Sequence, residues 1–213
     1  MKIELNNVIP APLAGISFNQ KSVWGNNVSF SSENNYLVNA PSGTGKSTLV
    51  SVLFGTRNDF TGEVFIDGKS TKNISLRDWS QLRKNSIAVV FQDLRLFPEL
   101  TALENILIKA KLAGSVSKEE ILLNAEKFGI ADRMNIRCRF LSLGQQQRVA
   151  ILRALVQPFS FLLLDEPFSH LDEKNIELAT ALIMEACRKN NAGLLLTSLG
   201  GNHLFNYKQS LTI

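Results

Sequence analysis

Residues 40–48 read Ala40-Pro41-Ser42-Gly43-Thr44-Gly45-Lys46-Ser47-Thr48 and nearly match the phosphate-binding loop G-x-x-x-x-G-K-[ST], with Ala40 in place of the first glycine. The apolar residues Tyr36-Leu37-Val38 precede them, and a helical pattern from Ser47 to Phe54 follows. Glycines let the backbone curl so that successive amides point at phosphate oxygens, and the helix presents its positive end to the same anion. The segment therefore predicts a strand, a phosphate-binding loop and a helix in succession.

Two side chains of this loop are suited to a bound nucleotide. Lys46 places a positive charge beside the phosphates, and the Ser47 hydroxyl is a ligand for Mg²⁺, which otherwise takes water, carboxylate and phosphate oxygens. Alanine is excluded only where the backbone needs a positive φ or the ligand needs the space of a Cβ, so we expect phosphate groups to bind despite Ala40. A Gly/Ser turn before a helix is the alternative interpretation of the segment taken alone.

Two acidic residues, Asp165 and Glu166, follow the apolar run Phe161-Leu162-Leu163-Leu164. Such a run predicts a strand that is buried on both faces, as in a parallel sheet covered by helices. Open parallel sheets bind ligands at the carboxyl ends of their strands. There, one acid can hold Mg²⁺ through water and the next can polarise an attacking water. An acidic turn after a strand is the alternative for this segment in isolation.

The rest of the chain alternates between strand and helix patterns. Strands are expected at residues 28–30, 63–67, 87–91 and 194–197, and helices at about 141–155 and 173–188. Two further helices are expected where Thr101 with Glu104, and Ser117 with Glu120, match the capping box. This alternation, with a helical block inserted near the middle, predicts an α/β core with a helical subdomain.

Composition narrows the classes of protein to consider. The chain has 213 residues, 45% of them apolar and 20% charged, which suits one folded domain rather than a disordered chain. No run approaches the roughly 18 apolar residues of a membrane helix, and the first residues lack the apolar region of a signal peptide, so we expect a cytoplasmic protein. Cys138 and Cys187 lie far apart without C-x-x-C spacing, which favours reduced, structural cysteines.

Three further motifs carry a resemblance to a known family. Residues 141–148 read Leu141-Ser142-Leu143-Gly144-Gln145-Gln146-Gln147-Arg148 and resemble the signature LSGGQ, followed by QQR, of ATP-binding cassette (ABC) ATPases. Residues 89–93, with Gln92, are similar to the Q-loop of the family, and residues 169–172, which end at Asp172, are similar to its D-loop. Order and spacing agree over about residues 18–199.

The resemblance implies a fold and an organisation. The fold is a P-loop NTPase of ABC type, an α/β protein with a parallel-sheet core, an N-terminal antiparallel β subdomain and an inserted α-helical subdomain. We expect residues 1–213 to form a single ABC ATPase domain, with the helical subdomain at about residues 93–157.

The resemblance also implies a role for each motif residue, with ATP and Mg²⁺ as the bound groups. ATP contacts are implied for Phe18, Pro41, Ser42, Gly43, Thr44, Gly45, Lys46, Ser47 and Thr48. Catalytic roles are implied for Lys46, Gln92 and Glu166, and Mg²⁺ binding for Ser47, Gln92 and Asp165. In the signature, Ser142, Leu143, Gly144 and Gln145 are implied to close the ATP site of a second copy, with Asp172 in the D-loop. Phe18 stands where the family stacks an aromatic ring on adenine; Trp24, or neither residue, is the alternative.

The partners follow from the same resemblance. One chain carries one phosphate loop and one signature, so a second ATP-binding subunit is expected, in a homodimer. Residues 91–101 resemble lipoprotein-release, cell-division and macrolide-export ATPases, which implies integral membrane permease-type subunits and a peripheral place on the cytoplasmic face of the inner (plasma) membrane. No nucleic acid is expected. The alternatives are an ATP-dependent clamp with little hydrolysis and a soluble ABC protein that does not transport.

One departure from the family bears on catalysis. The last buried strand should be followed by a switch histidine, but the chain reads Thr197-Ser198-Leu199-Gly200 there. A preorganised donor to developing charge is worth about 10²- to 10³-fold in rate, so we expect slow hydrolysis. His203 could replace the histidine only if the loop bulges, and His170 only by reaching across a dimer; surface roles are expected for both.

Overall fold

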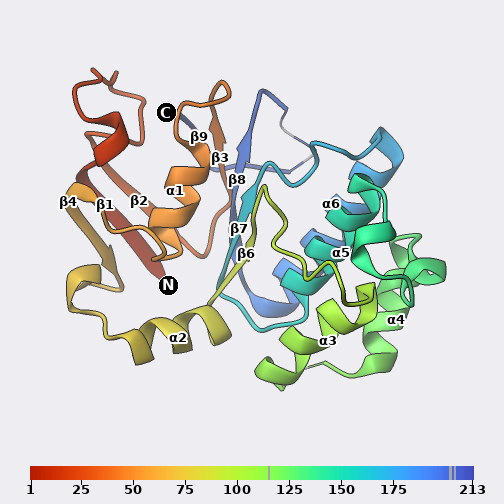
Figure 1. The fold of residues 1–213 in the computed structure, drawn as a ribbon. Helices are drawn as coiled ribbons and strands as arrows, with labels where there is room; N and C mark the ends of the chain where they lie inside the picture. Colours follow the sequence, from red (N-terminus) through yellow and green to blue (C-terminus); the bar gives the residue numbers. More distant parts are fainter. Residues whose placement is uncertain (115, 202, 204) are drawn as a thin grey trace.

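The computed structural model describes residues 1–114, 116–201, 203 and 205–213, and it contains two sheets (Figure 1). The smaller sheet is antiparallel, with the order β2-β1-β4-β5, and the larger is parallel, with the order β6-β7-β8-β3-β9. The strands of the smaller sheet are β1 Lys2–Pro10, β2 Asn27–Ser31, β4 Phe60–Ile66 and β5 Lys69–Ser70. Those of the larger sheet are β3 Tyr36–Asn39, β6 Ile87–Val90, β7 Phe161–Asp165, β8 Gly193–Ser198 and β9 Gln209–Thr212.

Six α-helices and four short 3₁₀ segments connect these strands in the described part of the chain. The α-helices are α1 Lys46–Leu53, α2 Leu76–Asn85, α3 Ala102–Ala113, α4 Lys118–Lys127, α5 Leu143–Leu155 and α6 Glu173–Asn190. The 3₁₀ segments are Ala11–Leu13, Thr71–Asn73, Ala131–Arg133 and Cys138–Phe140. Helices α3, α4 and α5 all fall between β6 and β7, so the inserted helical block is present.

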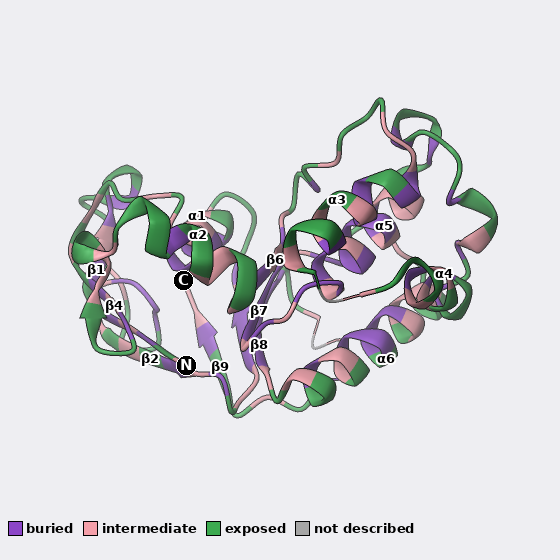
Figure 2. Cartoon of the chain, turned by 90° about the horizontal axis from the view of Figure 1, so that it is seen from below, coloured by how far each residue is buried: buried purple, intermediate pink, exposed green. Residues whose placement is uncertain are grey.

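The parallel sheet separates two apolar cores, because alternate side chains of its strands point to opposite faces. In β7, Leu162 and Leu164 join the core formed with α3 to α6, whereas Phe161 and Leu163 join the core formed with α1 and the antiparallel sheet. Figures 1 and 2 show the same division, with α1 and α5 on opposite sides of the buried strands. The expected α/β fold with an antiparallel sheet and inserted helices is confirmed.

Local capping sets several helix ends. Thr101 and Glu104 form the predicted capping box at α3. At α4 the prediction is half met, since Ser117 accepts from the Glu120 amide but only that half of the box forms. The expected helix at 141–155 begins two residues later, because the Ser142 side chain accepts from the Gln145 amide and makes Ser142 the N-cap of α5.

Other boundaries differ slightly from those expected. The strand expected at 63–67 runs over Phe60–Ile66, because Asp67 lies in the turn with a φ of 48°. The strand expected at 87–91 ends at Val90. None of the helices in the described residues combines the length and apolar character that crossing a membrane requires.

Candidate nucleotide-binding site

The phosphate-loop residues lie between the end of β3 and the start of α1. Gly45 has a φ of 112°, and a Cβ there would lie 2.9 Å from the Leu13 side chain, so only glycine fits. Ala40 is not among the positive-φ residues, and its amide donates to the Ser198 carbonyl, which explains why alanine is accepted there. No side chain of a described residue caps α1, so its first amides are free to bind an anion.

Lys46 is buried at the head of α1 and its ammonium group has three acceptors. Its Nζ donates to the carbonyls of Ala40 and Pro41, at 2.8 and 2.7 Å, and lies 3.1 Å from Glu166 Oε1. The two charged side chains are only 3% and 10% exposed. An ammonium group has three N–H donors, so all three are used, and one of these bonds has to be exchanged when a phosphate binds to Lys46.

Gln92 connects the two ends of the site. It follows β6, accepts a hydrogen bond from Ser47 Oγ at 3.0 Å, and places its amide nitrogen 3.5 Å from Glu166 Oε2. Because Lys46 and Ser47 are adjacent in the chain, these contacts close a ring of four residues, which we call the polar ring: Lys46, Glu166, Gln92 and Ser47. Three distant segments therefore contribute to one site.

Asp165, the last residue of β7, lies beside this ring and is 2% exposed. Its Oδ1 accepts from Thr197 Oγ1 at 2.8 Å, and burial raises the pKa of its carboxyl group. Ser47, Gln92 and Asp165 line one cavity of about 300 Å³. A hydroxyl, an amide carbonyl and a carboxylate are all oxygen ligands of the kind that Mg²⁺ prefers, so these residues fit that ion.

Glu166 has an unusual backbone. Its φ is 46°, a region that non-glycine residues rarely occupy, and its amide lies 3.3 Å from both the carbonyl and the hydroxyl oxygen of Thr197. Such strain persists only where the surroundings impose it, and it is concentrated at functional sites. The neighbouring strand β8 thus fixes the carboxylate against Lys46.

Gln147 is a site residue that the sequence patterns did not single out. It is 1% exposed on α5; its Nε2 lies 3.2 Å from both the Glu166 carbonyl and Ser169 Oγ, and its Oε1 accepts from the His170 amide at 3.0 Å. The helix that begins at Ser142 is thereby tied to the backbone of Glu166. The sequence did contain a signal for this role. Gln145, Gln146 and Gln147 are consecutive in α5, so their side chains point in different directions and one of them points inward.

Comparisons with known proteins identify the family of the chain. The profile of the ABC transporter family matches residues 25–169. The chain belongs to this family. It is an ATP-binding subunit of the ABC transporter type and an ATPase.

Similar proteins and solved structures are also ATP-binding proteins of the ABC family. The lipoprotein-releasing system ATP-binding protein LolD 2 of Rhodopseudomonas palustris is 35% identical over 162 residues, which cover 75% of this chain and 70% of that protein. An uncharacterized ABC transporter ATP-binding protein of Thermotoga maritima is 42% identical over 66% of this chain and 62% of that protein. The dimeric ATP-binding cassette MJ0796, solved in a post-hydrolysis state bound to ADP and Pi, has a TM-score of 0.83 and 26% identity, covering 99% of this chain and 94% of that one.

The predicted signature residues begin α5, which packs on the opposite face of the sheet from α1. Ser142 N-caps α5 and forms a capping box with Gln145, and both Ser142 and Leu143 are exposed, so the helix begins at the surface. Leu143 is 55% exposed. In the D-loop, the Asp172 carboxylate caps α6 by accepting from the Asn175 amide at 2.8 Å.

Of the two aromatic candidates for adenine stacking, one has no free surface. Trp24 is 0% exposed, so its ring has no face for a base. Phe18 is partly buried against the core shared by α1 and the antiparallel sheet. Phe18 therefore remains the candidate.

Leu199 and His203 lie at the end of β8 and line a cavity of about 300 Å³ together with Glu166. Leu199 is 61% exposed and carries no polar group. The surface role expected for His203 is wrong, because its half-buried ring packs against Phe168 at 4.9 Å between centroids. His170 is exposed, with its Nδ1 3.0 Å from Ser169 Oγ.

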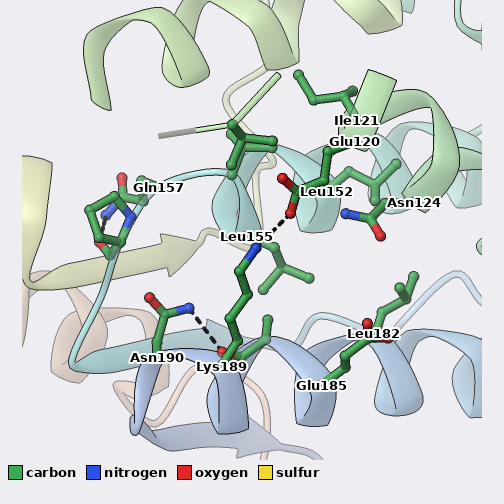
Figure 3. Close-up of a pocket in the computed structure, with 14 residues that line it drawn as sticks. Glu120, Ile121, Asn124, Leu152, Leu155, Gln157, Leu182, Glu185, Lys189 and Asn190 are labelled. Carbon is green, nitrogen blue, oxygen red and sulfur yellow. Dashed lines mark hydrogen bonds and ion pairs between the residues drawn. The ribbon is translucent and has the colours of Figure 1, made fainter. Parts of the chain in front are cut away.

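A separate cavity of about 150 Å³ lies between α4, α5 and α6 (Figure 3). Leu152, Leu155 and Leu182 contribute its apolar wall, and an ion pair of 2.6 Å joins Lys189 to Glu120 across the helices. It contains none of the predicted ATP-site residues, so it plays no part in the nucleotide site.

Proposed function

We propose that two copies of this chain close on ATP and Mg²⁺ and so drive partner membrane proteins. The observation that carries the proposal is the assembly of Lys46, Ser47, Gln92, Asp165 and Glu166, from the ends of β3, β6 and β7, at one edge of the parallel sheet. Their charges and oxygens are those that a nucleoside triphosphate and a divalent cation require.

ATP binding exchanges partners within the polar ring. The phosphates accept hydrogen bonds from Lys46 and from the amides of residues 42–48, and they replace the Glu166 carboxylate on Nζ. Glu166 is then free to polarise the attacking water. Ser47, Gln92 and Asp165 hold Mg²⁺, which when bound neutralises charge on the phosphate oxygens. In this proposal, ATP binding itself releases the Glu166 carboxylate from Lys46.

A second copy completes the site. In this proposal the signature residues Ser142, Leu143, Gly144 and Gln145 of one chain face the ATP held by Lys46 of the other, with Asp172 at the junction and Phe18 stacked on adenine. The position of α5 on the far face of the sheet from α1 supports a contact in trans. Hydrolysis then removes the preference for the closed pair.

The partners and the location are proposed from the relatives. A lipoprotein-releasing ATP-binding protein is among the similar proteins, which favours integral membrane permease-type subunits and a peripheral place on the cytoplasmic face of the inner membrane. We propose no nucleic-acid partner. Residues 1–213 act as one ATPase domain, with the helical block at about 93–157 turned toward the membrane subunits.

We also propose that this chain hydrolyses ATP slowly. Leu199 offers no hydrogen-bond donor where the family has a histidine, and an exposed leucine cannot stabilise developing phosphate charge. The test is the Leu199→His variant, measured for ATP turnover alone and with its membrane partner. We expect kcat to rise by about tenfold or more.

The same assay bears on the alternative function, an ATP-dependent clamp with little hydrolysis. If Leu199→His binds Mg-ATP normally but turns over no faster than the parent, the missing histidine does not limit hydrolysis. If the parent chain shows no affinity for Mg-ATP, measured by calorimetry, the proposed function itself is wrong.

A further inference from the structure

The cavity at the end of β8 contains a second group suited to phosphate chemistry. Glu166, Ser198 and His203 all line this cavity. The cavity opens beside the same carboxylate that the polar ring holds against Lys46. A phosphate bound at Lys46 would therefore have an imidazole in its neighbourhood as well as a carboxylate.

The loop holds the imidazole in place at three points. Phe168 meets the ring at an interplanar angle of 61°, and the Thr180 hydroxyl donates to the His203 carbonyl at 3.3 Å. Ser198 Oγ lies 3.4 Å from Nε2. Gly201 packs directly against the ring, since a Cβ at that position would lie 2.6 Å from Nε2 and the ring would have to move. These contacts hold the imidazole of His203 close to Ser198, the last residue of β8.

Hydrogen bonding decides which ring nitrogen carries the proton. The Ser198 hydroxyl oxygen accepts from the amides of Gly200 and Gly201, at 3.2 and 3.0 Å, which uses both of its lone pairs. Its proton is then left to donate to His203 Nε2. In a neutral imidazole the other nitrogen, Nδ1, must carry the N–H. No described residue accepts from Nδ1, and burial lowers the pKa of His203, which favours the neutral ring.

We propose that His203 Nδ1–H donates a hydrogen bond to a terminal phosphate oxygen of ATP during hydrolysis and so partly replaces the donor that Leu199 lacks. The inference rests on the proposed ATP site. In the step it assists, the water oxygen bonds to the γ-phosphorus and its proton moves toward Glu166. The bond from that phosphorus to the bridging oxygen breaks, and the electron pair stays on ADP. His203 adds no proton to the products.

The experiment compares four variants of the full chain by steady-state kinetics. His203→Ala should lower kcat by about tenfold or more while KM for ATP stays within about threefold, because the bond forms mainly in the transition state. His203→Asn, whose amide nitrogen falls near the Nδ1 position, should keep more turnover than His203→Gln, whose amide falls near Nε2. Gly201→Ala should behave like His203→Ala, because the new methyl group displaces the ring.

A second background separates catalysis from structure. In Leu199→His the donor is restored, so adding His203→Ala should cost less than about twofold in kcat. An equal loss in both backgrounds, no loss in the parent, or better turnover with Gln than with Asn would overturn the inference. If Mg-ATP still binds and Glu166→Gln still abolishes turnover, only the role of His203 fails, and the proposed function stands. Thermal midpoints of all variants show whether a loss of kcat reflects unfolding.

Discussion

At the scale of single residues, the buried carboxyl group of Asp165 is suited to bind Mg²⁺ but affects how the stability of the fold depends on pH. Its carboxyl group is almost excluded from water, and Glu166 adds a like charge, so the pKa of Asp165 is raised, chiefly by burial. Because the folded chain holds this proton more tightly than the unfolded chain, the contribution of Asp165 to stability falls as the pH rises above 3.8. Asp165 therefore stabilises the nucleotide-free fold less at neutral pH than at acid pH.

Asp165→Asn should accordingly stabilise the empty protein and abolish Mg²⁺-dependent turnover. The amide oxygen can still accept from the Thr197 hydroxyl, while the buried charge is gone. A gain of about 1 kcal/mol would raise the melting temperature by roughly 2–4 °C in a chain of this size. Differential scanning calorimetry at pH 7 measures it. The control is Asp132→Asn, an exposed carboxylate paired with Arg133, which should leave the melting temperature unchanged. A lower melting temperature for Asp165→Asn would contradict the argument.

At the scale of secondary-structure elements, the sequence predicted those elements whose signal lies within a few consecutive residues. Strand β7 and the loop before α1 were predicted because a buried apolar run and a glycine-rich loop are contiguous signals. Among the elements that were not predicted are β1, α2 and β9. In β1 a bulge between Asn6 and Ile9 interrupts the alternation, α2 has one buried residue, Trp79, and β9 has one, Leu211.

The arrangement of the site residues could not be predicted in the same way. The contacts among Lys46, Gln92 and Glu166 depend on the strand order of the parallel sheet, which brings together segments far apart in the chain. The position of His203 depends on contacts with Ser198, Phe168 and Thr180 that no sequence pattern indicates. Chemistry can be inferred from residue types, but geometry requires the fold.

Gln147 and Gln157 test how α5 supports the catalytic loop. Both are buried, but Gln147 bonds the backbone of Glu166 and His170, whereas Gln157 bonds the carbonyls of Arg83 and Ile87, away from the site. Replacing either by methionine leaves buried polar groups unsatisfied, which costs about 1–3 kcal/mol in urea denaturation. Only Gln147→Met should also lower kcat, by about tenfold, because Glu166 loses its support. Equal kcat losses in the two variants would show a general effect of instability.

At the scale of the whole molecule, the parallel sheet separates the two segments that we propose to contact nucleotide. The phosphate loop leads into α1 on one face, and the signature begins α5 on the other. In the proposed arrangement, a single chain thus contributes one half to each of two ATP sites. Two copies related by a two-fold axis would each complete the other, since such an interface pairs residue i with j and j with i.

Leu143→Glu tests this pairing without disturbing the fold. Leu143 is 55% exposed at the first position of α5, where a negative charge favours the helix dipole, so the variant should fold as stably as the parent. In a closed pair, the same carboxylate would face the phosphates held by the partner copy and repel them. In a Glu166→Gln background saturated with Mg-ATP, light scattering should show a dimer for the parent and a monomer for Leu143→Glu. Leu123→Glu is the matched control, since Leu123 is 52% exposed on α4 and should leave the dimer intact. A dimer that tolerates Leu143→Glu as well as Leu123→Glu would place the signature outside the interface.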